Sequence, residues 1–465
     1  MKHQPSALEA RGSSRFFQKA GTLIILLFSL LFVSHSLFAA DAKRPNIIFL
    51  LTDDMGLGDV GCYGGKVMPT PNIDRLASQG TRFTQYYVAS PVCSPSRAGL
   101  LTGSYPARWR ITNFLQTRAG NRASEQVDFL DPKAPAIGRA LKAAGYATAH
   151  VGKWHVGGGR DVTNAPPFSA YGFDEHAGTY ESPQPDPDIT ARNWIWSPDD
   201  KVKRWDRTSF FADKTLDFLK RHPNQPCYVN LWPDDVHTPW VPKGSDPAES
   251  KDSGDRENKL RAVLAEYDRQ VGRLLDGLKE LKMEDNTILV FSSDNGPLPT
   301  FNGARTTGLR GSKISLYEGG IRLPLIIRWP GHVPAGKVDE ESLINGVDLF
   351  PTFCAVAKAD LPKDTKFDGQ DLSKIFSGQP AVHAHPMLWE YGRNSSFGYP
   401  KGRNRSPNVA IRDGNWKLLI NADGTQTELY DLKTDAKEEN NVAAQNPEVT
   451  RRLSTLALDW RHSLP

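Results

Sequence analysis

The sequence contains little cysteine and little methionine, and this scarcity excludes several classes of protein. Four cysteines in 465 residues are too few and too scattered for a disulfide framework. They are Cys62, Cys93, Cys227 and Cys354. If Cys93 is committed to chemistry, the other three can form at most one bridge. The five methionines are too few to suggest a copper or haem protein.

The chain also lacks an excess of charge of either sign. It has 57 basic and 53 acidic residues and a net charge of +4 at pH 7. This balance gives no support for a nucleic-acid partner, and the only dense basic segment is the extreme N-terminus. Internal repeats and low-complexity tracts are absent as well. A hydrophobic content of 39% then indicates an ordinary globular protein of one large domain or two unequal ones.

The longest apolar run, residues 22–38, is short for a membrane span. Basic residues precede the run, and the small residues of "AADA" follow it. This order is typical of a secretory signal with a cleavage site. No cysteine directly follows the run, which argues against lipid attachment. We therefore predict that residues 1–42 are a signal peptide and that the mature protein is exported, periplasmic or secreted, with no stable membrane insertion. An uncleaved anchor is the alternative.

Apolar runs that alternate with helical stretches predict an α/β domain over residues 43–380. Residues 44–54, "RPNIIFLLTDD", read as a strand buried on both faces and closed by two carboxylates. Residues 258–283 have apolar side chains at helical spacing and predict a long amphipathic helix. Further strands are expected within 146–153, 225–233, 286–293 and 323–329. Strands and helices in alternation are typical of α/β architecture.

The pattern changes near residue 387 to short alternating pieces. Residues 408–420 and 427–432 read as hairpin strands, and residues 447–464 as a final helix. We therefore predict a smaller C-terminal α+β domain with a short antiparallel sheet, over residues 381–465.

Polar residues follow the apolar runs at the places where ligands bind in open α/β sheets. They are Asp53 with Asp54, Lys153 with His155, His237, and Asp294 with Asn295. Any one of these groups alone would usually be a turn or a helix cap. Four groups at equivalent positions favour a shared site. Three carboxylates and an amide oxygen suit Ca²⁺ or Mg²⁺ far better than Zn²⁺ or Cu, so one oxygen-ligated divalent cation is expected.

The segment "CSPSRAGLLTG", which begins at Cys93, resembles the signature of the type I sulfatases, Cys-x-Pro-Ser-Arg followed by Leu-Thr-Gly. The segments "GYATAHVGKWHVG", "SSDNGP" and "GSKISLYEGGIRLPLIIRWPG" resemble family segments in family order. The resemblance runs from Pro45 nearly to the C-terminus. It implies an alkaline phosphatase-like fold, in which helices cover both faces of a large mixed sheet.

The resemblance also implies a role for each residue of the site. A formylglycine-generating maturation enzyme would convert Cys93 to 3-oxoalanine (formylglycine), which with four side chains would bind one Ca²⁺. Those four are Asp53, Asp54, Asp294 and Asn295. Arg97 would orient the hydrated aldehyde, Lys153 and Lys313 would contact the sulfate, and His155 and His237 would transfer protons.

The chemistry explains why a cysteine would be converted. An enzyme sulfate ester formed on serine would hydrolyse slowly, whereas an aldehyde hydrate carries two hydroxyls on one carbon. One hydroxyl can attack sulfur, and deprotonation of the other can then expel sulfate and restore the aldehyde. We assign His237 as the acid for the leaving alcohol and His155 as the base for the second hydroxyl.

The expected function is hydrolysis of a sulfate ester, with a sulfated small molecule or glycan as substrate. A phosphodiester or phosphonate monoester hydrolase of the same superfamily is an alternative. A glycan-binding protein that never acquires the aldehyde is another. Asp234 and Asp235 could touch a sugar hydroxyl or form a solvated turn, and Trp154, Trp232 and Trp240 could stack on sugar rings or pack in the core.

Overall fold

The structure is a computed structural model, and it describes Met1 and residues 44–189, 200–246, 256–392 and 400–465. The signal peptide predicted for residues 1–42 lies, apart from Met1, outside the described residues. Arg44–Pro465 form one compact unit. Within the described ranges, no helix is long and apolar enough to cross a membrane.

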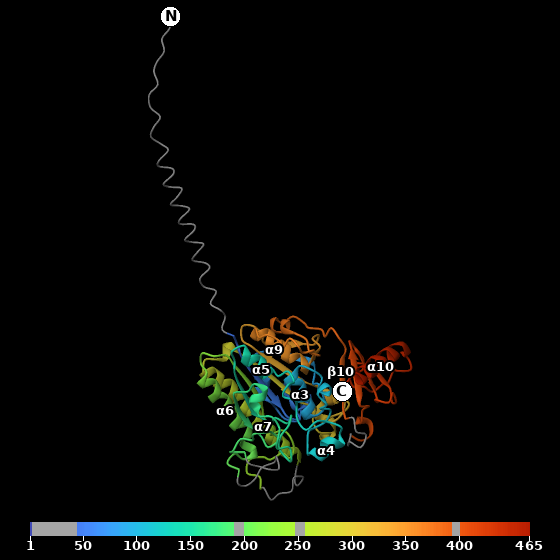
Figure 1. The fold of residues 1–465 in the computed structure, drawn as a ribbon, viewed down its shortest axis with the longest axis horizontal. Coiled ribbons are helices and arrows are strands. Elements are labelled where there is room, and N and C mark those ends of the chain that lie inside the picture. Colours follow the sequence, from blue (N-terminus) through green and yellow to red (C-terminus); the bar gives the residue numbers. More distant parts are fainter. Residues whose placement is uncertain (2–43, 190–199, 247–255, 393–399) are drawn as a thin grey trace. The chain divides into compact units, whose positions relative to one another are not determined.

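A nine-stranded mixed sheet forms the centre of this unit (Figure 1). Its strand order is β4-β3-β5-β1-β6-β7-β2-β8, and β9 also pairs with β2. The strands are β1 (Asn46–Thr52), β2 (Thr81–Tyr87), β3 (Ala147–Gly152), β4 (Glu175–Gly178), β5 (Cys227–Trp232), β6 (Thr287–Ser293), β7 (Arg322–Arg328), β8 (Lys337–Asp339) and β9 (Ile344–Asn345). The apolar runs of the sequence correspond to β1, β3, β5, β6 and β7, so these predicted strands are confirmed.

The direction of the strands decides where their ends lie. β1 is parallel to both neighbours, with Ile47 opposite Tyr228 of β5 and Ile288 of β6, and β3 is parallel to β5. β7 is antiparallel to β6 and to β2, so β2 runs in the same direction as β6. The carboxyl ends of β1, β2, β3, β5 and β6, and the amino end of β7, therefore lie along one edge of the sheet.

Helices cover both faces of the sheet, and its central strands are therefore buried on both sides. Alternate residues of β1 belong to two different apolar clusters: Ile47 and Phe49 to one, Ile48 and Leu50 to the other. The first cluster contains side chains of α3 (Cys93–Thr102), α5 (Ile137–Ala143) and α9 (Leu349–Ala357). The second contains side chains of α2 (Pro71–Ser78), α6 (Arg207–Arg221) and α7 (Arg256–Glu280). The expected α/β sandwich is confirmed.

Two short helices complete the main unit. They are α4 (Arg118–Ala123) and α8 (Glu318–Ile321).

A second, antiparallel sheet of four strands lies in the C-terminal part of the chain, as the sequence predicts. Its order is β10-β11-β12-β13, with strands β10 (Met387–Glu390), β11 (Val409–Asp413), β12 (Trp416–Ile420) and β13 (Glu428–Asp431). One face packs on α10 (Pro447–His462) through Leu453. Ala410 and Leu419 on the other face belong to the apolar cluster of the main sheet. The boundary at 380/381 stays a prediction.

Candidate active site

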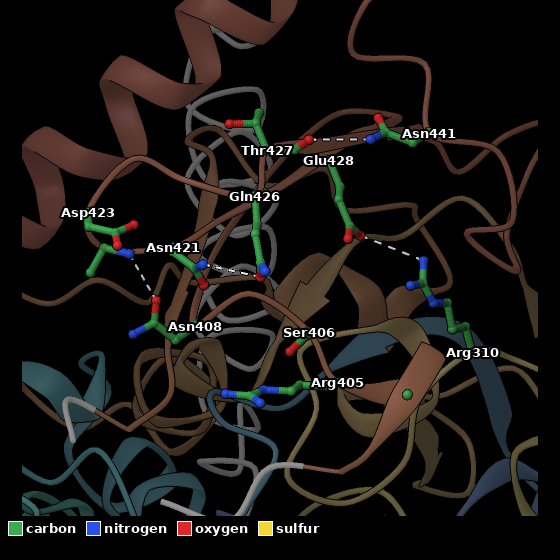
Figure 2. A pocket seen from close by; sticks show the side chains of 12 residues that line it. Arg310, Arg405, Ser406, Asn408, Asn421, Asp423, Gln426, Thr427, Glu428 and Asn441 are labelled. Carbon is green, nitrogen blue, oxygen red and sulfur yellow. Dashed lines mark hydrogen bonds and ion pairs between the residues drawn. The ribbon is translucent and has the colours of Figure 1, made fainter. Parts of the chain in front are cut away.

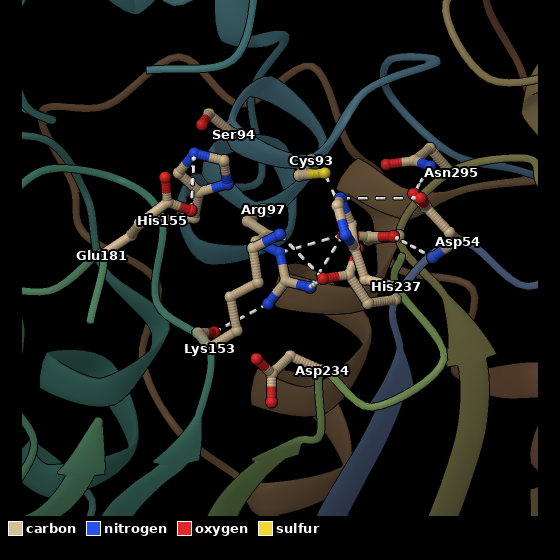
Figure 3. Close-up of polar contacts among 12 residues, drawn as sticks. Asp54, Cys93, Ser94, Arg97, Lys153, His155, Glu181, Asp234, His237 and Asn295 are labelled. Atoms are coloured by element: carbon tan, nitrogen blue, oxygen red, sulfur yellow. Dashed lines mark hydrogen bonds and ion pairs between the residues drawn. The ribbon is translucent and has the colours of Figure 1, made fainter. Parts of the chain in front are cut away.

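The predicted site residues come together at the edge of the sheet where the parallel strands end (Figure 3). Asp53 and Asp54 follow β1, Lys153 follows β3, and Asp294 and Asn295 follow β6. His237 lies in the turn after β5, and Lys313 lies in the loop before α8. Cys93 and Arg97 lie in the first turns of α3, which follows β2. The strand directions thus explain the convergence of six separate segments of the chain.

Cys93 is the first residue of α3, and it is 2% exposed. Its Sγ lies 3.6 Å from Oδ1 of Asp53. Burial raises the pKa of the Cys93 thiol well above its ordinary range, so the thiol stays protonated. The free N–H groups of the first turn of α3 favour an anion beside this residue.

Two lysines pair with the two carboxylates that follow β1. Nζ of Lys153 lies 2.7 Å from Oδ2 of Asp53, and Nζ of Lys313 lies 2.6 Å from Oδ1 of Asp54. Burial raises the pKa of both carboxyls, but attraction to these lysines outweighs it and holds both pKa values below the ordinary range. Both carboxylates are therefore charged and poised to bind cations.

Arg97 is completely buried and fixes the third carboxylate. Its Nε and Nη2 donate to Oδ2 of Asp294 at 3.0 and 2.7 Å, and its Nη1 donates to the carbonyl of Lys153 at 2.7 Å. Burial, with repulsion from Asp53, raises the pKa of Asp294 to about 7. A cation beside these carboxylates would relieve this repulsion.

The oxygen donors fit a hard divalent cation. Ligand atoms of Asp53, Asp54, Cys93 and His237 all lie within 4.8 Å of one another. Asn295 donates through Nδ2 to Asp54 at 2.7 Å, while its Oδ1 is buried and has no hydrogen-bond partner among the described residues. A buried amide oxygen without a partner suits a metal ligand. His237, which the sequence analysis grouped with these carboxylates, lies beside them.

His237 is neutral in this arrangement. Burial, and then the charge of Lys313, lower its pKa to about 4. Nε2 of His237 lies 3.1 Å from Nζ of Lys313, and Nδ1 lies 2.6 Å from the carbonyl of Thr238. Because a carbonyl only accepts, Nδ1 carries the proton and Nε2 accepts from Lys313. Nε2 therefore carries no proton of its own, and a proton passed on through Nε2 would first have to come from Lys313.

His155 lies in the wall of the site rather than among the carboxylates. Its Nε2 lies 3.0 Å from the carbonyl of Leu115 and 3.2 Å from Oε2 of Glu181. Figure 3 shows Glu181 on one side of the ring and Arg97 and Cys93 toward the other. No motif or periodicity in the sequence marked Glu181, which follows β4 in an irregular segment.

The surroundings of Asp234 and Asp235 can now be compared with the alternatives that the sequence left open. Asp234 and Asp235 are buried, so they do not form a solvated turn. Asp234 accepts from Arg204 and Arg207, and Nη2 of Arg204 also donates to the carbonyl of His237 at 2.7 Å. The ion pair between Arg204 and Asp234 thus holds the turn that carries His237. No local pattern marked Arg204, because its partners lie about thirty residues away in the chain.

Three tryptophans beside the site motifs are core residues. Trp154, Trp232 and Trp240 are 0%, 1% and 5% exposed, so they are not free to stack on a sugar ring. The four cysteines are free thiols, and no bridge forms among them.

A polar cavity lies at the end of the C-terminal sheet (Figure 2). Its volume is about 840 Å³. Its walls carry hydroxyl, amide and charged groups, including Arg310, Arg405, Asn421 and Gln426. Arg310 also lines a second cavity of about 390 Å³, which reaches Ser312, the neighbour of Lys313. The polar cavity therefore adjoins the loop that supplies a lysine to the site.

The Sulfatase family model matches residues 45–359, and the model described as N-sulphoglucosamine sulphohydrolase, C-terminal, matches residues 312–459. Since the first match covers more than half of the chain, this protein belongs to the sulfatase family, the formylglycine-dependent enzymes of the alkaline phosphatase superfamily. It is accordingly a hydrolase of sulfate esters.

Named relatives span most of the chain. An N-acetylgalactosamine-6-O-sulfatase of Bacteroides thetaiotaomicron is 32% identical, over 90% of this chain and 93% of the relative. Human arylsulfatase A is 30% identical, over 90% of this chain and 88% of the relative. Human N-acetylgalactosamine-6-sulfatase is 35% identical, over 71% of this chain and 65% of the relative.

Solved structures agree with the fold. A 6S-sulfatase structure from work on glycosaminoglycan metabolism by Bacteroides thetaiotaomicron has a TM-score of 0.73 at 28% identity, and covers 90% of this chain and all of that one. The complex of Ps i-CgsB with a neocarrahexaose has a TM-score of 0.72 at 28% identity, over 90% of this chain and 93% of that one. A phosphonate monoester hydrolase of Agrobacterium radiobacter shares the fold, with a TM-score of 0.64 at 22% identity, over 90% of this chain and 96% of that one.

Proposed function

We propose that this protein is an exported, calcium-dependent sulfatase that hydrolyses a sulfate ester on a sulfated carbohydrate, through formylglycine formed from Cys93. The observation that carries the proposal is the position of Cys93, at the start of a helix and 3.6 Å from Asp53. A buried thiol with a raised pKa is a poor nucleophile and a poor metal ligand. Conversion to an aldehyde hydrate would turn this position into a source of hydroxyl groups.

The charges around Cys93 suit a sulfate monoester. Lys153, Lys313 and Arg97 bring three positive charges into a buried site, where they interact strongly with an anion. Asp53, Asp54, Asp294 and Asn295, with residue 93, would hold one Ca²⁺. The ion would supply charge stabilisation for the sulfate oxygens and for the nucleophilic hydroxyl.

A sulfated sugar is the substrate class that the surroundings favour. Two of the relatives are N-acetylgalactosamine-6-sulfatases by name, and one similar structure was solved with a neocarrahexaose. The polar cavity beside the Lys313 loop presents amide and guanidinium groups that can pair with sugar hydroxyls (Figure 2). We therefore propose 6-O-sulfated N-acetylgalactosamine as the first substrate to test.

The first experiment measures the mass of the peptide that contains Cys93 and the turnover of the Cys93→Ala variant. Conversion of the thiol to the aldehyde lowers the peptide mass by about 18 Da. We expect this change in active protein, and a loss of turnover of about 10³-fold or more in Cys93→Ala. Cys62→Ala, a half-buried cysteine outside the site, is the matched control and should keep full activity. Substantial turnover by Cys93→Ala would contradict the covalent route.

A second experiment separates the alternative functions. Aryl sulfate, an aryl phosphodiester and a phosphonate monoester are compared on protein whose Cys93 is converted. Preferred turnover of sulfate supports the proposal, whereas preferred turnover of either phosphorus ester supports the other hydrolase. An unmodified Cys93 peptide together with sugar binding and no hydrolysis would indicate a glycan-binding protein.

N-terminal sequencing of the exported protein tests cleavage of residues 1–42.

A further inference from the structure

The two ring nitrogens of His155 have different surroundings. Nε2 faces two acceptors, the carbonyl of Leu115 at 3.0 Å and the carboxylate of Glu181 at 3.2 Å. Nδ1 is buried and has no hydrogen-bond partner in the part of the chain that the structure describes. In Figure 3 this second edge of the ring is turned toward the side of the site where Arg97 and Cys93 lie.

These surroundings determine where the proton resides. Neither a carbonyl nor an ionised carboxylate can donate a hydrogen bond, so Nε2 must carry the proton. Burial, and then the charge of Lys153, hold the pKa of His155 well below its ordinary range, so the ring is neutral and has a single proton. Nδ1 is left with a lone pair that no described residue uses.

Glu181 is itself held rigidly. Its side chain is 6% exposed, and Oε1 accepts from Nε and Nη2 of Arg160 at 3.2 and 2.6 Å. Its backbone carbonyl accepts from the backbone N–H of His155 at 3.0 Å. His155 has a left-handed backbone with a φ of 56°, a conformation that persists only where the surroundings enforce it. Glu181 therefore fixes both the backbone and the ring of His155.

The second acceptor connects the ring to the nucleophile segment. Leu115, whose carbonyl faces Nε2, donates its own N–H to Oγ of Ser94 at 2.8 Å. Ser94 is the residue next to Cys93 in the first turn of α3. The ring of His155 is thus oriented from two sides, by Glu181 and through Ser94.

We infer that Glu181 is a positioning residue, which holds His155 as the Nε2–H tautomer and offsets the positive charge that arises when Nδ1 takes up a proton. The inference rests on the proposed function. In the release step, the second hydroxyl at residue 93 gives its proton to Nδ1. The electron pair of that O–H bond forms the aldehyde C=O bond, and the bond from carbon to the sulfate oxygen breaks and releases sulfate.

The first test requires no activity. Protein with ¹⁵N-labelled histidine and the Cys93→Ala change is examined by NMR, and His155→Gln identifies the signal of His155. We expect the ¹⁵N shifts of an Nε2–H tautomer. Glu181→Gln should keep this tautomer, because its amide oxygen can still accept from Nε2, whereas Glu181→Leu should broaden or shift the signal. An Nδ1–H tautomer, or no response to Glu181→Leu, would overturn the inference.

The second test follows turnover of aryl sulfate by the Glu181→Gln enzyme. Loss of a charged partner should lower kcat on the order of 10- to 100-fold with little change in KM. Because sulfate release should become slower than bond cleavage, a burst of phenol equal to the enzyme concentration should precede the steady state. Glu175→Gln, which removes a similar but exposed Arg221 pair, is the matched control and should behave as wild type.

The two tests separate failure of the inference from failure of the proposed function. If Glu181→Gln turns over like wild type while Cys93 is converted, Glu181 has no part in proton transfer and the inference is wrong. If wild type hydrolyses no sulfate ester, the proposed function fails, and the tautomer measured by NMR still decides whether Glu181 orients His155.

Discussion

At the scale of single residues, burial sets the chemistry of the site. The thiol of Cys93 lies in a completely buried position, where its pKa rises because the thiolate would lose its hydration. Lys153 and Lys313 keep their charges in the same surroundings because each faces a carboxylate within 2.7 Å. The site therefore holds charged groups ready for an anion, but no ready thiolate.

His237 permits a test that depends on the leaving group. Its Nε2 accepts from Lys313, so the ring can relay a proton from Lys313 to the departing alcohol. Replacement by alanine should cost about 10²–10⁴-fold with an alkyl sulfate and much less with an activated aryl sulfate, because a good leaving group needs no acid. The measurement is kcat/KM for both esters. Equal losses would argue against an acid role.

At the scale of elements, α10 and the C-terminal sheet form a small core whose stability can be measured. Leu453 of α10 is completely buried against this sheet, whereas Leu456, one turn further along, is 42% exposed. Leu453→Ala should lower the free energy of unfolding by about 2–5 kcal/mol, because it leaves a cavity. Leu456→Ala should change it by about 0.5 kcal/mol or less. Urea unfolding of both variants checks the difference, and equal effects would show that α10 does not stabilise the fold through Leu453.

A buried ion cluster joins β12 to α8 and to the loop before α10, and it predicts a pH dependence. Nζ of Lys417 lies 2.9 Å from a carboxylate oxygen of Glu318 and 2.9 Å from one of Glu438. Burial raises the pKa of Glu438 to about 7, and repulsion from Glu318 adds to this effect, against the attraction of Lys417. Between pH 4.5 and about pH 7, the folded protein keeps a proton on Glu438 that the unfolded chain, with an ordinary pKa of 4.5, has already released.

The sign of the effect follows from this difference. Between about pH 4.5 and 7, the contribution of Glu438 to stability should fall as the pH rises. Glu438→Gln, which cannot ionise, should lose less stability than wild type between pH 5 and pH 8 in urea unfolding. Glu439→Gln, an exposed neighbour, is the control and should follow wild type. Parallel losses in wild type and Glu438→Gln would contradict the role of this carboxylate.

At the scale of the whole molecule, the carboxylates that follow β1 and β6 should link cation binding to folding. Asp54 and Asp294 are brought together only when two strands pair, so the unfolded chain offers no such site. Calcium should raise the melting temperature, with about 1.4 kcal/mol gained for each tenfold excess over Kd, and EGTA should reverse the gain and abolish turnover. Asp294→Asn should retain less calcium on purification. Metal content and calorimetry are the measurements, and undiminished calcium in the variant would contradict the site.

The sequence by itself determined the central strands of the main sheet and most of the site. The strands β1, β3, β5, β6 and β7 appear as mainly apolar runs, and the polar residues after β1, β3, β5 and β6 mark the ends of those runs. Parallel strands bring such ends to one edge, so Asp53, Lys153 and Asp294 could be grouped without coordinates. The segment around Cys93 identified the family because its spacing is distinctive.

Only the tertiary structure decided the surroundings of these residues. β2 has no uninterrupted apolar run, and its antiparallel pairing with β7, which makes the sheet mixed, depends on partners about 240 residues away. Glu181 and Arg204 carry no local signal, because each acts on a histidine supplied by another segment of the chain. Periodicity and motif spacing report local structure and burial. Which buried charge faces which ring nitrogen is decided by packing between distant segments.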